Sequence, residues 1–222
     1  MKGQLQAGVL VLALAAPLAG AAQDSSARPD PSKFPARASY QGVTIAAVPI
    51  PDTPAAERIF GPRAAPTRAG FLPVEVIIFN QRSEIIQVKV GRIKIIGFDN
   101  QFEQVNPQAV AEGLYPRPEI DRPKTSRGPR LPIPWPRKQK VKKDKKRAQR
   151  EEAEAALRSR QLRAALVAPG GYARGYLYFD LRGKSIDLAG SSLYVPGVEE
   201  EATGERLLFF EISLKPYVET ED

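Results

Sequence analysis

The side chains with the clearest chemical potential in this sequence are eight cations within 13 residues. They are Lys138, Lys140, Lys142, Lys143, Lys145, Lys146, Arg147 and Arg150. Such a cluster can bind an anionic envelope component, such as a phosphate-bearing lipid in peripheral membrane contact or an acidic polysaccharide, or it can bind an acidic protein surface. On a helix these cations would surround much of the circumference, which is equally the pattern of a solvated helix that binds nothing.

A second candidate is a run of tyrosines near the end of the chain. Alternation along 172–181 places Tyr172, Tyr176 and Tyr178 on one face of a predicted strand, opposite apolar residues. Exposed rings in a strip of this kind would suit a glycan or a peptide. Aromatic residues are also common on strands for packing reasons. A helix laid across the strip would make both features structural.

The composition excludes several classes of enzyme, because the chain has no His and no Cys. Neither Ser-His-Asp nor Cys-His catalysis can be built, and an ordinary zinc site lacks its ligands. The sequence also lacks a phosphate loop, a dinucleotide fingerprint and a calcium loop. We therefore predict no catalytic residue, no cofactor and no metal site. The remaining enzymatic alternative is a carboxylate-based hydrolase, whose candidate acids are Glu75, Asp99, Glu103, Asp180, Asp187 and Glu211.

The formal net charge of +8 comes from one segment. Between Arg117 and Arg150 there are 14 Lys and Arg against three acids, a local net charge of +11, so the rest of the chain carries about −3. The residues that could bind an anionic partner are therefore confined to 117–150, and the rest of the protein is close to neutral.

The first 22 residues predict export. Lys2 precedes an apolar run from Ala7 to Leu18, and small residues follow to Ala22, which is the pattern of a signal peptide cleaved after Ala21 or Ala22. Even when extended to Ala22, the run of 16 residues is shorter than the roughly 20 needed to span a bilayer, although a retained anchor is the alternative. We expect a periplasmic or secreted protein, for which nucleic acid is not the partner.

Short apolar alternating segments predict a mainly β protein. We expect strands near 43–48, 72–79, 85–90, 92–98, 172–181, 186–195 and 207–215, with turns rich in Gly, Asn and Pro. Both faces of 72–79 are apolar, which predicts a central strand, and the short turn after it predicts a hairpin with 85–90. These elements favour an antiparallel β-sandwich, with a small barrel as the alternative.

The predicted domain organisation is simple. A flexible leader at 23–39 is followed by a single β-sandwich domain at 40–217 and an acidic tail at 218–222. An insert at 99–168 interrupts the sandwich. It combines a Pro-rich stretch at 115–137, where seven of 23 residues are Pro, with a long basic helix at 138–167 that lacks Gly and Pro.

Two sequence stretches resemble a known family. The strand-plus-Asn segment Gly70-Phe71-Leu72-Pro73-Val74-Glu75-Val76-Ile77-Ile78-Phe79-Asn80, with Pro169-Gly170-Gly171 and Gly175-Tyr176-Leu177-Tyr178-Phe179, is similar to exported bacterial immunoglobulin-like domain proteins of uncharacterised function. The resemblance implies an immunoglobulin-like β-sandwich and brings no catalytic residues. The basic insert departs from the compact form of that family.

These observations lead to one functional hypothesis and two alternatives. We expect an exported, non-enzymatic binding or accessory protein of the bacterial cell envelope. The first alternative is a structural subunit of an envelope assembly that uses its helical insert for oligomerisation. The second is the carboxylate-based hydrolase.

Overall fold

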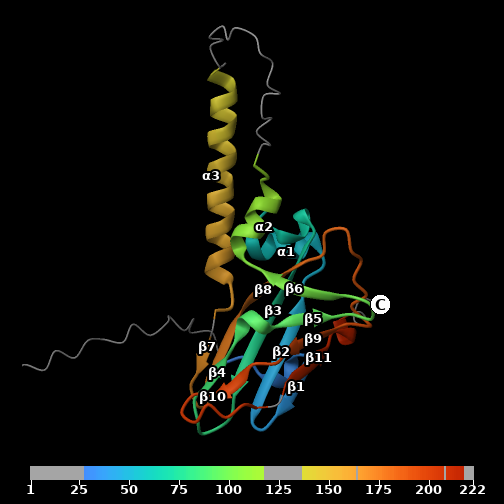
Figure 1. The fold of residues 1–222 in the computed structure, drawn as a ribbon, viewed down its shortest axis with the longest axis vertical. Helices are drawn as coiled ribbons and strands as arrows, with labels where there is room; N and C mark the ends of the chain where they lie inside the picture. The colour runs from blue at the N-terminus through green and yellow to red at the C-terminus, as the bar shows by residue number, and fades with distance from the viewer. Residues whose placement is uncertain (1–27, 118–136, 164, 208, 218–222) are drawn as a thin grey trace, which may run out of the picture.

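The computed structural model describes residues 28–117, 137–163, 165–207 and 209–217, and at 137–143, 165 and 216 it describes the backbone alone. The described chain is mainly β, with eleven strands in an antiparallel sheet of eight and a second sheet of three, together with three α-helices (Figure 1). The predicted signal peptide at 1–22, most of the Pro-rich stretch and the acidic tail at 218–222 lie outside the described residues.

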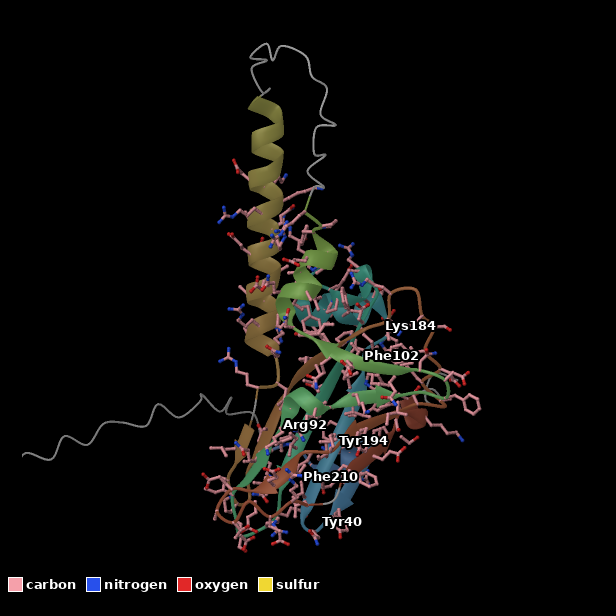
Figure 2. All side chains as sticks on the ribbon, viewed as in Figure 1. Tyr40, Arg92, Phe102, Lys184, Tyr194 and Phe210 are labelled. Carbon is pink, nitrogen blue, oxygen red and sulfur yellow. The ribbon has the colours of Figure 1, made fainter. Side chains whose placement is uncertain are left out.

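The large sheet folds over on itself around one apolar core. Its strand order is β1-β2-β3-β8-β6-β5-β9-β11. The strands are β1 (Arg37–Tyr40), β2 (Val43–Pro49), β3 (Phe71–Asn80), β5 (Lys94–Ile96), β6 (Gln101–Val105), β8 (Tyr172–Asp180), β9 (Ser192–Val195) and β11 (Phe210–Ser213). β6 and β8 share two residue pairs, which makes their junction the corner of the sheet. The first and last strands then meet, with the rings of Tyr40 and Phe210 6.5 Å apart (Figure 2).

The core explains why these segments are strands. Alternate residues of β2, β3, β8, β5, β9 and β11 enter a single apolar cluster, and the small sheet of β4 (Ile86–Val88), β7 (Ala165–Val167) and β10 (Val198–Glu200) adds to it. All ten residues of β3 are buried, as expected for a central strand. Each fully buried Val, Ile or Leu side chain stabilises the fold by about 1.5–3 kcal/mol relative to an exposed one, so the core is the main source of stability.

The helices cover the outer face of β3 and β8. They are α1 (Thr53–Phe60), α2 (Pro107–Leu114) and α3 (Arg137–Arg160). Asp52 and Asn106 cap α1 and α2, their side-chain oxygens accepting hydrogen bonds from backbone N–H groups in the first turn, with Pro inside each helix start. Figure 1 shows α1, α2 and the C-terminal end of α3 gathered at one end of the sheet, while the rest of α3 extends away from it.

α3 is fastened to β8 where the helix ends. The hydroxyl of Tyr178 donates a hydrogen bond of 2.9 Å to the carbonyl of Leu157, one of the carbonyls that the helix leaves without a partner in its last turn. Beyond the helix, the N–H of Leu162 donates to the carbonyl of Tyr176 at 3.0 Å. A Cβ on Gly175 would lie 2.6 Å from the Leu162 backbone, so the missing side chain lets the chain cross the strand.

The expectation of a flexible leader is wrong from Pro31 onwards. The leader predicted at 23–39 is structured from Pro31 onwards, with a 3₁₀ turn, buried Ala36 and strand β1. Gln41 and Gly42 both have positive φ, which is the two-residue turn that joins β1 to β2 as a hairpin. The leader is rich in Ser, Pro and Ala, but this two-residue turn lets its last residues pair with β2.

The insert is shorter than the predicted 99–168. β6 belongs to the large sheet and β7 to the small one, and the helix predicted over 138–167 ends at Arg160. The segment that leaves the sheets therefore begins with α2 and ends with α3.

The predicted hairpin between 72–79 and 85–90 is also wrong. β3 pairs with β2 and β8, whereas β4 pairs with β7 and β10. The fully buried Asn80 explains the change, because its amide donates to the carbonyls of Glu84 at 2.7 Å and Val167 at 2.9 Å. Its side-chain oxygen accepts from the N–H of Arg82, so Asn80 turns the chain out of the large sheet.

We predict that Tyr178→Phe lowers the free energy of unfolding by about 1–2 kcal/mol, because the Leu157 carbonyl is left buried without a partner. Urea denaturation followed by circular dichroism measures the change. Tyr172→Phe is the control, since the Tyr172 hydroxyl has no hydrogen bond among the described residues; an equal loss in both variants would contradict the assignment.

We predict that Gly175→Ala costs about 1–3 kcal/mol of stability, because the new methyl group would overlap the Leu162 backbone. Gly91→Ala is the matched control. A Cβ on Gly91 meets nothing within 4 Å, so we expect a change below about 0.5 kcal/mol. If the two variants melt at the same temperature, the contact between Gly175 and the Leu162 backbone tolerates a side chain, and the prediction is wrong.

Candidate functional site

The predicted basic cluster lies along the N-terminal half of α3. We call residues 137–150 of this helix the basic arm; they include nine Lys and Arg and one acid, Asp144. Lys138, Lys140, Lys142 and Lys143 lie on described backbone without described side chains, whereas Lys145, Lys146 and Arg147 are exposed. The N-ε group of Arg147 donates to Glu151 at 2.8 Å, and this hydrogen bond raises the pKa of the guanidinium.

Arg150 differs from the other cations of the cluster. Its side chain is half-buried, and Nε donates a hydrogen bond of 3.1 Å to the carbonyl of Tyr115, just beyond α2. Arg150 therefore fastens α3 to α2. Arg150 thus makes a structural contact, and its place in the anion-binding patch stays a prediction.

Apart from Arg150, the basic arm lies N-terminal to the contacts that hold α3 on the body. Ala153 and Leu157 are buried against the body, and Glu152 forms an ion pair of 3.6 Å with Arg63. Residues 144–148 are all exposed. At 1.5 Å per residue the 24-residue helix is about 36 Å long, and its far half stands clear of α1 and α2 (Figure 1).

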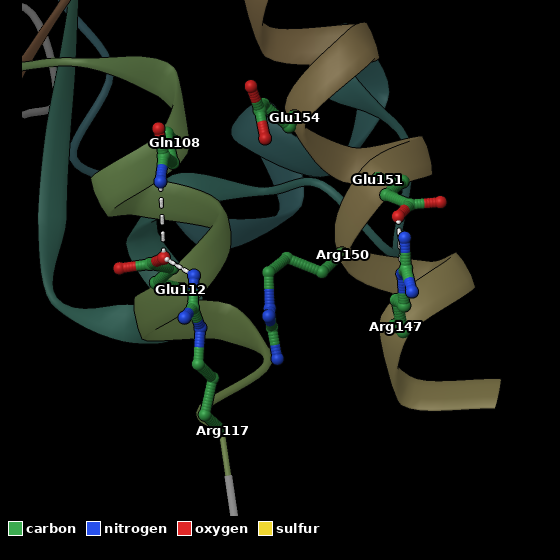
Figure 3. Close-up of a pocket in the computed structure, with 7 residues that line it drawn as sticks. All are labelled: Gln108, Glu112, Arg117, Arg147, Arg150, Glu151 and Glu154. Atoms are coloured by element: carbon green, nitrogen blue, oxygen red, sulfur yellow. Dashed lines mark hydrogen bonds and ion pairs between the residues drawn. The ribbon is translucent and has the colours of Figure 1, made fainter. Parts of the chain in front are cut away.

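A groove of about 460 Å³ lies between α2 and α3 at the base of the basic arm (Figure 3). It is lined by Gln108, Glu112, Arg117, Arg147, Arg150, Glu151 and Glu154. The hydrogen bond from Gln108, followed by the charges of Arg117 and Arg150, lowers the pKa of Glu112. Arg117 binds Glu112 at 2.8 Å. The three arginines are balanced by three carboxylates, so the groove is nearly neutral and the excess positive charge lies further along α3.

The predicted aromatic strip is not an exposed surface. Tyr178 is 1 % exposed, and its ring lies 5.9 Å from that of Phe60 in α1. Tyr176 is half-buried and packs edge-on to the same phenylalanine at 4.9 Å. Tyr172 packs on Phe79. The alternation of residues was read correctly, but the helices cover the face on which the tyrosines lie.

The six candidate carboxylates are distributed over several regions. Glu75 forms an ion pair of 2.6 Å with Arg174, Asp180 pairs with Arg182, and Glu211 accepts from Ser192. Asp99 and Asp187 do share a cavity of about 180 Å³ at the β5–β6 turn, where one Asp187 oxygen accepts from the N–H of Ala189. Glu103 lies on the outer face of β6.

A second aromatic pair, exposed Phe209 with half-buried Tyr194, was not predicted from the sequence. Tyr194 and Phe209 have ring centroids 5.4 Å apart on the outer face of the strands opposite α3. The signal was present, because residues 207–215 alternate and Phe209 falls on the face opposite the buried Phe210. The alternation is hard to read at the start of this segment, because the four residues Leu207–Phe210 are all apolar.

Among the described residues, no cluster of three or more acidic, His or Cys side chains could hold a metal ion. None of their helices is long and apolar enough to cross a membrane. The sequence matches no protein-family model, no curated protein and no solved structure. The function must therefore be inferred from the geometry of the chain itself.

We predict that part of the tyrosine content ionises at unusually high pH. Burial, together with the nearby charge of Glu75, raises the pKa of Tyr176 to about 12, and burial raises that of Tyr217 to about 12. Burial also raises the pKa of Tyr178. An unfolded tyrosine titrates near about 10, so the native state holds more protons above that pH and stability falls as pH rises from about 10 through about 12.

Tyrosinate absorbance of native and urea-unfolded protein, titrated side by side, measures this difference. The native curve should lag behind the unfolded one near about pH 11. Tyr176→Phe should narrow the gap, because it removes one of the tyrosines whose pKa is raised in the native state. Superimposable native and unfolded curves would contradict the prediction.

Proposed function

We propose that the protein is an exported, non-enzymatic binding protein of the bacterial cell envelope, and that the basic arm docks it on an anionic envelope component. The observation that carries this proposal is the position of the charge. The positive excess of the chain lies on a helical segment whose described side chains at 144–148 are exposed, while the other half of the same helix is packed on the body.

The electrostatics favour a surface over a small ligand. Cations that surround a helix cannot converge on one small anion, but several of them can approach an extended anionic surface at once. Each Lys or Arg near an anionic membrane surface contributes about 1 kcal/mol to binding. Lys145 and Lys146 have no ion pair among the described residues, so their charges are free for such contacts.

The fold inference rests on the layers of the sheet. We infer an immunoglobulin-like β-sandwich, in which β1-β2-β3-β8 and β6-β5-β9-β11 are the two layers. The shared core, the narrow corner at β6 and β8, and the contact between β1 and β11 support this arrangement. The near approach of the two edge strands equally suits the barrel alternative.

The charge can be tested with one triple variant. We expect Lys145→Gln, Lys146→Gln and Arg147→Gln together to weaken binding to vesicles of phosphatidylglycerol and phosphatidylcholine by at least about tenfold. Co-sedimentation of protein recovered from an expressing bacterium measures this, and binding of the unaltered protein should fall as salt rises, because salt screens exposed charges.

The control changes the same net charge elsewhere. Lys33, Arg58 and Arg92 are exposed on the body, and their joint replacement by Gln should leave most of the binding intact. If both triple variants lose vesicle binding equally, binding depends only on net charge, and the proposal that the basic arm is the docking site is wrong. A change of oligomeric state in the first variant, seen by sedimentation velocity, would instead favour the structural-subunit alternative.

A further inference from the structure

The two outer faces of the large sheet are unequal. The helices bury their apolar residues against β3 and β8, and Phe34 covers Phe79 and Ile77 next to them. The outer face of β6, β5, β9 and β11 instead carries side chains that are half-buried or exposed. Figure 2 places Tyr194 on this part of the body, away from α3.

Strand register aligns four side chains across the open face. Glu103 pairs with Lys94, Lys94 pairs with Tyr194, and Tyr194 pairs with Glu211, so the row crosses all four strands. The neighbouring row of Phe102, Ile95, Leu193 and Ile212 is buried in the core, which fixes the first row as outward-facing.

The row is organised around an aromatic pair. Phe209 is 54 % exposed, its ring inclined by 39° to that of Tyr194, so the two rings form a shallow platform. The Lys94 ammonium lies over the Tyr194 ring, 5.7 Å from its centroid, and donates to the Gln101 side chain at 2.9 Å, so Phe209 is the more open ring of the pair. On the other side, one Glu211 oxygen accepts from Ser192 at 2.8 Å, leaving the second oxygen without a bond among the described residues.

We infer that this open face is a binding site for a neutral polysaccharide, with Phe209 and Tyr194 as the stacking platform. The apolar C–H face of a pyranose ring suits the negative face of an aromatic ring. Flanking carboxylate, amide, hydroxyl and ammonium groups supply both acceptors and donors for sugar hydroxyls. Lys94 against Glu103 and Glu211 leaves the row with a small negative charge, which disfavours a polyanionic glycan.

A protein partner fits this face less well. The cores of protein interfaces are depleted in charged residues. Here charged side chains occupy three of the four row positions, and the rings stand among them. The site is separate from the basic arm, so the two inferences can fail independently.

Affinity electrophoresis of the exported chain tests the inference, in gels containing hydroxyethylcellulose, glycol chitin, soluble starch or alginate. The buffer holds about 0.5 M salt, which screens the basic arm. We expect at least one of the three neutral polymers to retard the protein. Phe209→Ala and Tyr194→Ala should each weaken that retardation about tenfold, the upper range for loss of an aromatic contact.

Leu166→Ala is the control, because Leu166 is 62 % exposed but lies on the small sheet. Melting temperatures of all variants identify a loss of folding, and Phe209→Ser repeats the test at the more exposed ring. Retardation by no neutral polymer, equal loss in Leu166→Ala, or retardation by alginate alone would overturn the inference. A face that serves another polypeptide would give the first of these results.

Discussion

The crossing of the chain over β8 determines where everything outside the core lies. At Gly175 the backbone of Leu162 approaches so closely that no side chain fits between them. Three residues along the strand, Tyr178 supplies the hydrogen bond that the last turn of α3 lacks. Backbone contact and helix cap together fix the direction of α3, and the buried face of the helix shares one apolar cluster with α1 and α2. A short stretch of one strand thus orients the entire helical layer.

This arrangement gives the protein two different surfaces. On the side of β3 and β8 the sheet is buried twice, once by the core and once by the helices, which is why β3 has no exposed residue. On the side of β9 and β11 the outer face stays open to solvent. The excess charge belongs to a third location, at the unpacked end of α3, where it adds no repulsion to the folded body. The residues that stabilise the fold and the residues that remain exposed on the surface therefore lie in different segments of the chain.

The sequence predicted the parts of this fold that depend on local periodicity. The two apolar faces of β3 identified a central strand, and the alternation along β8 identified both of its faces. The predictions that were wrong concerned contacts between segments far apart in the sequence. Asn80 sends the chain to a second sheet through bonds to Val167, which is 87 residues away, and no local pattern reveals that. The tyrosines of β8 were assigned to the correct face, and the alternative of a helix across them is what the structure shows for Tyr176 and Tyr178, whereas Tyr172 packs on Phe79. At the site, charge density located the basic arm, whereas the partner of Arg150 came from a separate helix.

α3 also has a mechanical character. From Arg137 to the first buried residue, Ala153, the helix extends about 24 Å without a buried contact in its described part, and beyond that point it is clamped. The chain continues from α3 into β7, which pairs with β4 in the small sheet, while α2 follows β6 of the large sheet. The two helices packed against each other are therefore anchored in different sheets, so the helical layer ties the two sheets together.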